Sequence, residues 1–140
     1  MAVNTKRVLI GALAGGVAWT ILSTAINMAC LAKRYEQAQA AGLFQTEPRI
    51  PFFLGIWILM LFVLAWIGAT LYALARAAWG PGPLTALKVG VMLGFAAGIP
   101  SNFGSATWAT FGRIFPFCWA IELGLGAVIA TLIAAWLYRD

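Results

Sequence analysis

Four long, largely apolar stretches constrain this chain more than any other feature. They cover residues 8–32, 51–79, 84–111 and 115–138 of the 140-residue sequence. About 20 consecutive apolar residues are enough for an α-helix to cross a hydrocarbon core of roughly 30 Å. Because a segment in lipid must satisfy its own backbone hydrogen bonds, each stretch is predicted to be a transmembrane helix.

The composition also indicates a membrane protein. Hydrophobic residues make up 63% of the chain and charged residues 9%, whereas soluble domains are roughly 45 to 50% apolar and about 25% charged. The net charge of +5 comes from Lys and Arg residues that stand singly or in pairs beside the apolar stretches, where they meet lipid head groups. We therefore expect the lipid bilayer as a partner and no nucleic acid, since the chain has no basic stripe with interleaved aromatic residues.

The predicted fold is one all-α domain over residues 1–140, an integral membrane four-helix bundle. The first stretch is longer than the apolar core of a signal peptide, so it is expected to remain as a helix. The third stretch is the least regular, because its apolar run from Leu84 to Ile99 stops at Pro100. We expect a helix that kinks at Pro100 and resumes, or a helix that is broken there and followed by a re-entrant or interfacial segment.

Four crossings place both termini on one side of the membrane. Five Lys and Arg residues are expected on that side and four on the other. Positive residues are enriched in cytoplasmic segments of membrane proteins. The termini are therefore predicted to be cytoplasmic.

Glycine residues at regular spacing predict close helix packing. Gly90, Gly94 and Gly98 repeat every four residues on the third predicted helix, and Gly11 and Gly15 do so on the first. A face without side chains lets a second helix approach closely and gain the van der Waals contacts that drive association in lipid. The favoured interpretation is packing within one bundle, and the alternative is that one of these faces docks a partner subunit.

Glu122 is the only acidic residue inside a predicted span. A carboxylate in the membrane is expensive unless it is neutral, paired or beside water. Judged by the rise of each helix, Asn27, Ser23 and Asn102 lie at a comparable depth, and Arg113 at the membrane edge could reach inward. We predict a buried polar cluster of these five residues. Its favoured role is hydrogen bonding between helices, and the alternative is a proton- or cation-coupled site.

No pattern of residues identifies an enzyme or a metal site. The chain has no histidine, and Cys30 and Cys118 stand far apart in the sequence. This composition argues against a zinc site of the usual type and against histidine-ligated haem. Hydrolase, nucleotide and protease fingerprints are missing as well. We expect no catalytic residue and no dedicated cofactor, although a lipid, a quinone or a pigment could be held by contact with the aromatic side chains.

Two short segments carry a resemblance to known proteins. Residues 80–86 (GPGPLTA) and 135–139 (AWLYR) resemble an uncharacterised group of small four-helix bacterial inner-membrane proteins. The resemblance implies a bacterial, multi-pass protein of the inner (cytoplasmic) membrane with the same four spans. It implies no functional residue.

Three hypotheses for the function follow. The leading one is a non-catalytic accessory or structural subunit that packs beside other integral membrane subunits of a larger respiratory, photosynthetic or other energy-converting complex. The alternative is a small homo-oligomeric transporter or channel that uses Glu122. A third, a membrane enzyme or lipid-binding protein, has only hydroxyl and amide side chains to support it.

Overall fold

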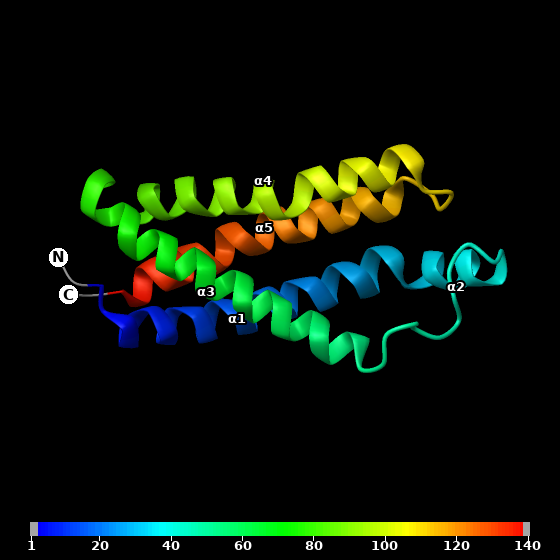
Figure 1. The fold of residues 1–140 in the computed structure, drawn as a ribbon, viewed down its shortest axis with the longest axis horizontal. Coiled ribbons are helices and arrows are strands. Elements are labelled where there is room, and N and C mark those ends of the chain that lie inside the picture. The colour runs from blue at the N-terminus through cyan, green and yellow to red at the C-terminus, as the bar shows by residue number, and fades with distance from the viewer. Residues whose placement is uncertain (1–2, 139–140) are drawn as a thin grey trace.

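Long helices make up the structure, a computed structural model that describes residues 3–138 and has no strand among them. In chain order the elements are α1 (Thr5–Ile26), the π-helical segment η1 (Asn27–Leu31), α2 (Ala32–Ala40), α3 (Phe53–Trp79), α4 (Pro83–Trp108) and α5 (Ile114–Leu137) (Figure 1). α1, η1 and α2 follow one another without a break and form one long helix from Thr5 to Ala40. Together with α3, α4 and α5, the described chain therefore has four long helices. All four are long and apolar enough to cross a membrane. The predicted multi-pass membrane protein with an all-α bundle is confirmed.

Both termini lie at one end of the bundle, which we call the termini end (Figure 1). There the backbone N–H of Asn4 donates a hydrogen bond to the Tyr138 hydroxyl over 2.8 Å. The short α3–α4 turn also lies at this end, whereas α2 and the connections 41–52 and 109–113 lie at the opposite end, the loop end. Which end faces the cytoplasm stays a prediction.

The third spanning helix is continuous, so the expectation of a break with a re-entrant segment is wrong. Helix α4 continues through Pro100 and ends at Trp108, three residues earlier than predicted. Pro100 removes the hydrogen bond to the Ala96 carbonyl. Transmembrane helices tolerate such a proline because local adjustments of the helix and neighbouring groups satisfy the freed carbonyl. At the start of α3, Phe52 has a left-handed φ of 57°, so the helix begins at Phe53 and Pro51 lies in the turn before it.

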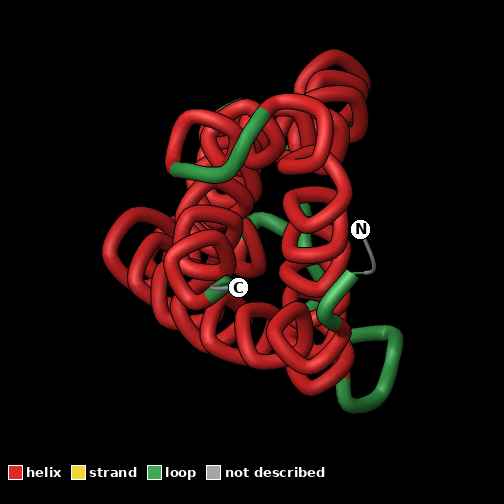
Figure 2. Tube along the Cα trace, turned by 90° about the vertical axis from the view of Figure 1, so that its left-hand side faces the viewer, coloured by secondary structure: helices red, strands yellow, loops and turns green. Residues whose placement is uncertain are grey.

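Helix α5 is the centre of the bundle. It packs against α1, α3 and α4, whereas α1 and α4 make no contact with each other in the described part of the chain. Figure 2 shows the bundle viewed from its termini end. The buried face of α5 is built mainly from small residues, which include Gly126, Ala127, Ala130, Thr131 and Ala134. Small side chains let three neighbours come close to one helix.

The glycine row of α4 lies directly on the backbone of α5. A Cβ atom added to Gly90 would lie 2.7 Å from the Cα of Val128, and one added to Gly94 would lie 2.9 Å from the Cα of Gly124. Gly98 continues the row against the same helix. These two helices therefore touch backbone to backbone.

Helix α1 approaches the other side of α5 in the same way. A Cβ atom on Gly11 would lie 2.9 Å from the Cα of Ala134, and one on Gly15 would lie 3.0 Å from the carbonyl oxygen of Ala130. Both glycine rows that the sequence contains are thus used inside one bundle.

Helix α3 packs closely along only half of its length. Its buried residues begin at Leu61 and are mostly small: Leu61, Ala65, Gly68, Ala69, Tyr72 and Ala73. The first two turns carry larger side chains, such as Phe53 and Trp57, which line the space between α3 and α4. On the α1 side the Trp57 ring N–H donates to the Ser23 hydroxyl over 3.4 Å. Helices α3 and α4 are joined by the tight Gly80–Gly82 turn and diverge from it toward the loop end (Figure 1). The divergence leaves a wedge between them.

The contact between α4 and α5 predicts the effect of single methyl groups. Gly94→Ala places a Cβ against backbone that cannot move aside, so the free energy of unfolding should fall by about 1 to 3 kcal/mol. Gly104→Ala, on the same helix, meets open space and should be neutral or stabilising by up to about 1 kcal/mol. Unfolding in mixed detergent micelles, followed by circular dichroism, measures both. Equal effects of the two changes would contradict the packing described.

Candidate functional site

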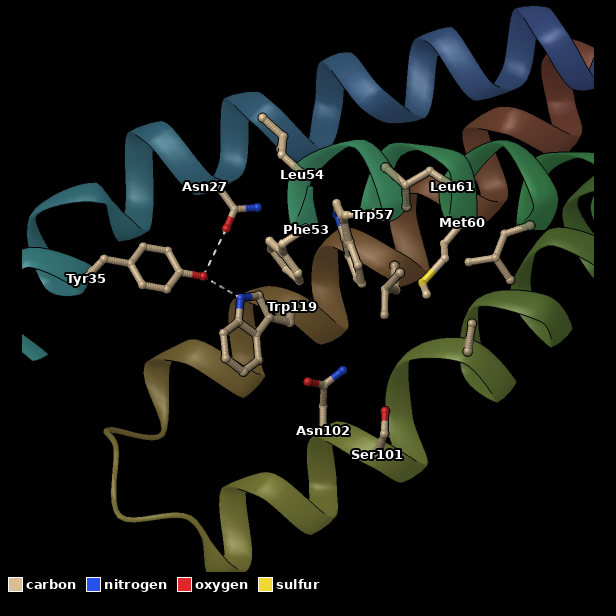
Figure 3. Close-up of a pocket in the computed structure, with 13 residues that line it drawn as sticks. Asn27, Tyr35, Phe53, Leu54, Trp57, Met60, Leu61, Ser101, Asn102 and Trp119 are labelled. Carbon is tan, nitrogen blue, oxygen red and sulfur yellow. Dashed lines mark hydrogen bonds between the residues drawn. The ribbon is translucent and has the colours of Figure 1, made fainter. Parts of the chain in front are cut away.

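The wedge between α3 and α4 forms a cleft of about 740 Å³ in the loop-end half of the bundle (Figure 3). Residues of five elements line it. The α3 wall consists of Phe53, Leu54, Trp57, Met60, Leu61 and Leu64. The remaining walls are Ala97, Ser101 and Asn102 from α4, Trp119 and Leu123 from α5, Asn27 from η1 and Tyr35 from α2.

The cleft opens sideways, toward the lipid. Phe53, Leu54 and Met60 at its mouth are exposed, while Leu61 at its floor is fully buried. At 1.5 Å per residue, the α3 wall from Phe53 to Leu64 extends about 17 Å from the start of the helix. The cleft therefore extends from the interface toward the middle of the bilayer.

A chain of four polar side chains lies at the back of the cleft. The Asn27 amide nitrogen donates to Oε2 of Glu122 over 2.9 Å, and the Tyr35 hydroxyl donates to the Asn27 amide oxygen over 3.2 Å. The Trp119 ring N–H donates to the Tyr35 hydroxyl over 2.9 Å. Figure 3 shows the last two of these bonds. We call this series the Glu122 chain.

The π-helical segment positions the Glu122 chain. Asn27 opens η1, and Tyr35 follows eight residues later on α2. Eight residues of regular α-helix overshoot two full turns by about 80°. The wider turns of a π-helix bring Tyr35 back to the face that carries Asn27, and such segments occur frequently at functional sites.

Glu122 sits behind Asn27 and is almost fully enclosed, with 1% of its surface exposed. Its Oε2 accepts the Asn27 bond, whereas its Oε1 is buried and has no hydrogen-bond partner among residues 3–138. An unpaired polar oxygen in this setting costs free energy. The carboxyl group therefore keeps a hydrogen-bonding capacity that Asn27 alone does not use.

Two other predicted members of the cluster lie near Glu122 without bonding to it. Ser23, one helical turn before Asn27, accepts a bond from the Asn27 amide at its backbone oxygen, over 3.0 Å. Asn102 lies on the opposite wall, where its amide nitrogen donates to the Gly98 carbonyl over 2.7 Å. The structure puts the cleft between Asn102 and the Glu122 chain.

Arg113 does not belong to the cluster. It precedes α5 at the loop end, and its side chain is exposed. Glu122 lies two turns further along α5, facing the interior. The expectation that Arg113 reaches inward is wrong, because an arginine at the edge of the membrane satisfies its charge in water and head groups.

Sequence reasoning missed Tyr35, Trp57 and Trp119. Trp119 lies three residues before Glu122, a spacing that puts both side chains on one face of α5. That spacing could have identified Trp119. Tyr35 could not have been identified in this way, because its position depends on the π-helical turns, which no residue pattern announces.

Comparisons with known proteins leave the function to be inferred from this cleft. The chain matches no protein family, and neither a curated protein nor a solved structure is significantly similar to it. Within the described residues no group of three or more His, Cys, Asp or Glu side chains could hold a metal ion. The arrangement instead offers apolar walls with amide and hydroxyl groups at the back.

The bond between Asn27 and Glu122 can be measured by a double-mutant cycle. Asn27→Leu, Glu122→Leu and the double variant should show a coupling free energy of about 0.5 to 2 kcal/mol in unfolding experiments in micelles. Asn27→Leu alone should be the most destabilising, because it leaves the buried carboxyl group without its donor. Glu122→Gln, which keeps an oxygen acceptor, serves as the control. Strictly additive effects would show that the two side chains do not interact.

Proposed function

We propose that this protein is a non-catalytic binding component of a bacterial inner membrane, which takes up a lipid-soluble molecule in the cleft between α3 and α4. The observation that carries the proposal is the cleft itself: a cavity of about 740 Å³ with a lipid-facing mouth and polar groups at its back. Binding sites for small molecules are typically apolar cavities of this size with a few placed polar groups.

The chemistry of the lining supports binding rather than catalysis. The polar groups are amides, hydroxyls and indole N–H groups, several of which already bond to one another. Such groups hold and orient a ligand. The one titratable group of the lining, the Tyr35 hydroxyl, is already engaged by Asn27 and Trp119, whereas acid–base catalysis needs such a group within hydrogen-bond reach of the reacting atom. Glu122, the one buried acid of the described chain, lies behind Asn27 rather than in the wall of the cleft.

The rest of the bundle argues against the alternative, a channel or transporter that uses Glu122. Beyond the cleft, toward the termini end, the interior is closed by packed apolar side chains, among them Trp19, Ala127 and Ala130. A second apolar cluster that includes Val8, Ala69 and Ala134 continues to that end. A path for an ion requires polar groups or water across the whole membrane. The polar groups here favour a pocket open to one half of the bilayer.

A substitution that fills the cleft tests this proposal. Ala97 lines the cleft on α4, and its neighbour Ala96 is exposed on the lipid side of the same helix. Ala97→Phe should lower the amount of bound lipophilic molecule about tenfold or more, since a loss of 1.4 kcal/mol already changes a dissociation constant tenfold. Ala96→Phe should leave it unchanged. The measurement is organic extraction of purified protein in mild detergent, followed by mass spectrometry against the protein amount.

Equal yields of bound molecule from the two variants would refute a binding role for the cleft. Both variants must first show the helical content and unfolding transition of the wild type, so that a folding defect is not read as lost binding.

We further propose that this binding component works as an accessory subunit beside larger integral membrane proteins of an energy-converting complex. The lateral mouth supports this, because a neighbouring protein could reach a ligand held there without the ligand leaving the membrane. After mild-detergent extraction from its native membrane, the protein should migrate on native gels with much larger proteins, identified by mass spectrometry. Migration only as a dimer or trimer of itself would favour the transporter instead.

A further inference from the structure

The lining of the cleft excludes a charged head group as its ligand. None of the described residues that line it is Lys, Arg, Asp or Glu. A phosphate or an ammonium group moved into such a site would lose its hydration without gaining a counter-charge. The part of the ligand that reaches the back of the cleft must therefore be uncharged.

Unused hydrogen-bonding groups lie on the α4 wall. The Asn102 amide nitrogen donates one hydrogen to the Gly98 carbonyl and keeps its second hydrogen unused, and the Ser101 hydroxyl has no hydrogen-bond partner within residues 3–138. Figure 3 shows both side chains directed from α4 into the space below α3 and α5. Both groups can donate a hydrogen bond into the cleft. A ligand with acceptor atoms at the depth of Asn102, about 9 Å from the end of α4 at Trp108, would gain these two bonds.

Aromatic rings form the wall opposite these groups. Phe53 and Trp57 of α3 stack with their ring centroids 6.4 Å apart, and the Trp119 ring of α5 lies beside them in the cleft. Aromatic side chains favour offset or edge contacts with another flat ring. The Trp119 ring is fixed by its bond to Tyr35, so this wall is held in place before a ligand enters.

We infer that the cleft binds a quinone-type molecule: a flat, uncharged ring with ring oxygens and an apolar tail. The inference rests on the proposed function and names its ligand class. The ring lies between Trp119 and Trp57 on one side and Asn102 on the other. Its oxygens accept hydrogen bonds from the Asn102 amide and the Ser101 hydroxyl. Its tail leaves through the apolar mouth along Leu54 and Met60.

A benzoquinone with a ten-carbon alkyl tail is the probe, added to the full chain in lipid nanodiscs of phosphatidylcholine. Quenching of tryptophan fluorescence reports binding, since two tryptophans line the cleft. Saturable quenching is expected for the wild type and for Ala96→Phe. Ala97→Phe should abolish the saturable part, and Asn102→Leu should weaken binding about tenfold by removing the bond to a ring oxygen. Ser101→Ala, at an exposed position, gives a second reading if Asn102→Leu fails to fold.

A control ligand separates the ring oxygens from the rest of the molecule. The matching alkylbenzene, which has no oxygens, should bind weakly. Its affinity for Asn102→Leu should equal its affinity for the wild type. Diacylglycerol, a neutral lipid without a flat ring, should fail to compete with the quinone at equal mole fraction.

Two results would overturn the inference, and they differ in what they leave standing. If diacylglycerol or another lipid binds in a manner that Ala97→Phe abolishes while the quinone shows no saturable quenching, the ligand class is wrong and the cleft still binds. If Ala97→Phe changes neither the binding of the quinone nor the amount of any extracted lipid, the proposed binding function is wrong together with the inference.

Discussion

Backbone contact between α5 and its two glycine-bearing neighbours is the interaction on which the rest of the structure depends. In lipid no hydrophobic force draws apolar helices together, so stability comes from van der Waals contact over closely matched faces. The glycine rows of α1 and α4 meet the small-residue faces of α5, and a single Cβ at Gly90 or Gly94 would overlap the α5 backbone. These two contacts fix three of the four helices.

The position of α3 follows from that arrangement. Its second half has Ala65, Gly68 and Ala69, which fit against α1 and α5, whereas its first half has Trp57 and other large side chains. Close packing of α3 against α4 is therefore reached only near the tight turn that joins them. At the loop end the helix stays apart from α4, and the space becomes a cleft with lipid at its mouth. The small residues in the second half of α3 thus anchor the helix, and the large residues in its first half line the cleft.

The polar groups of the site are tied to the same scaffold. Glu122 and Trp119 lie on α5, and Asn27 begins the π-helical segment. The Tyr35 hydroxyl hydrogen-bonds to both Asn27 and Trp119, and Asn27 hydrogen-bonds to Glu122. Because α5 is held rigidly by α1 and α4, the Trp119 ring has a fixed place at the back of the cleft. A preorganised wall loses less entropy when a ligand binds.

The sequence by itself determined the four membrane helices, the common end of both termini and the depth of Glu122, Asn27, Ser23 and Asn102, because length, hydropathy and helical rise are properties of one segment at a time. It also identified the glycine faces but not their partners. Only the tertiary structure decided that Asn27 bonds to Glu122, that Arg113 stays outside, that α4 runs unbroken through Pro100 and that a cleft separates Asn102 from the Glu122 chain. These features depend on the rotation and divergence of helices relative to one another, and on the π-helical turns at Asn27, which no single segment encodes in its hydropathy.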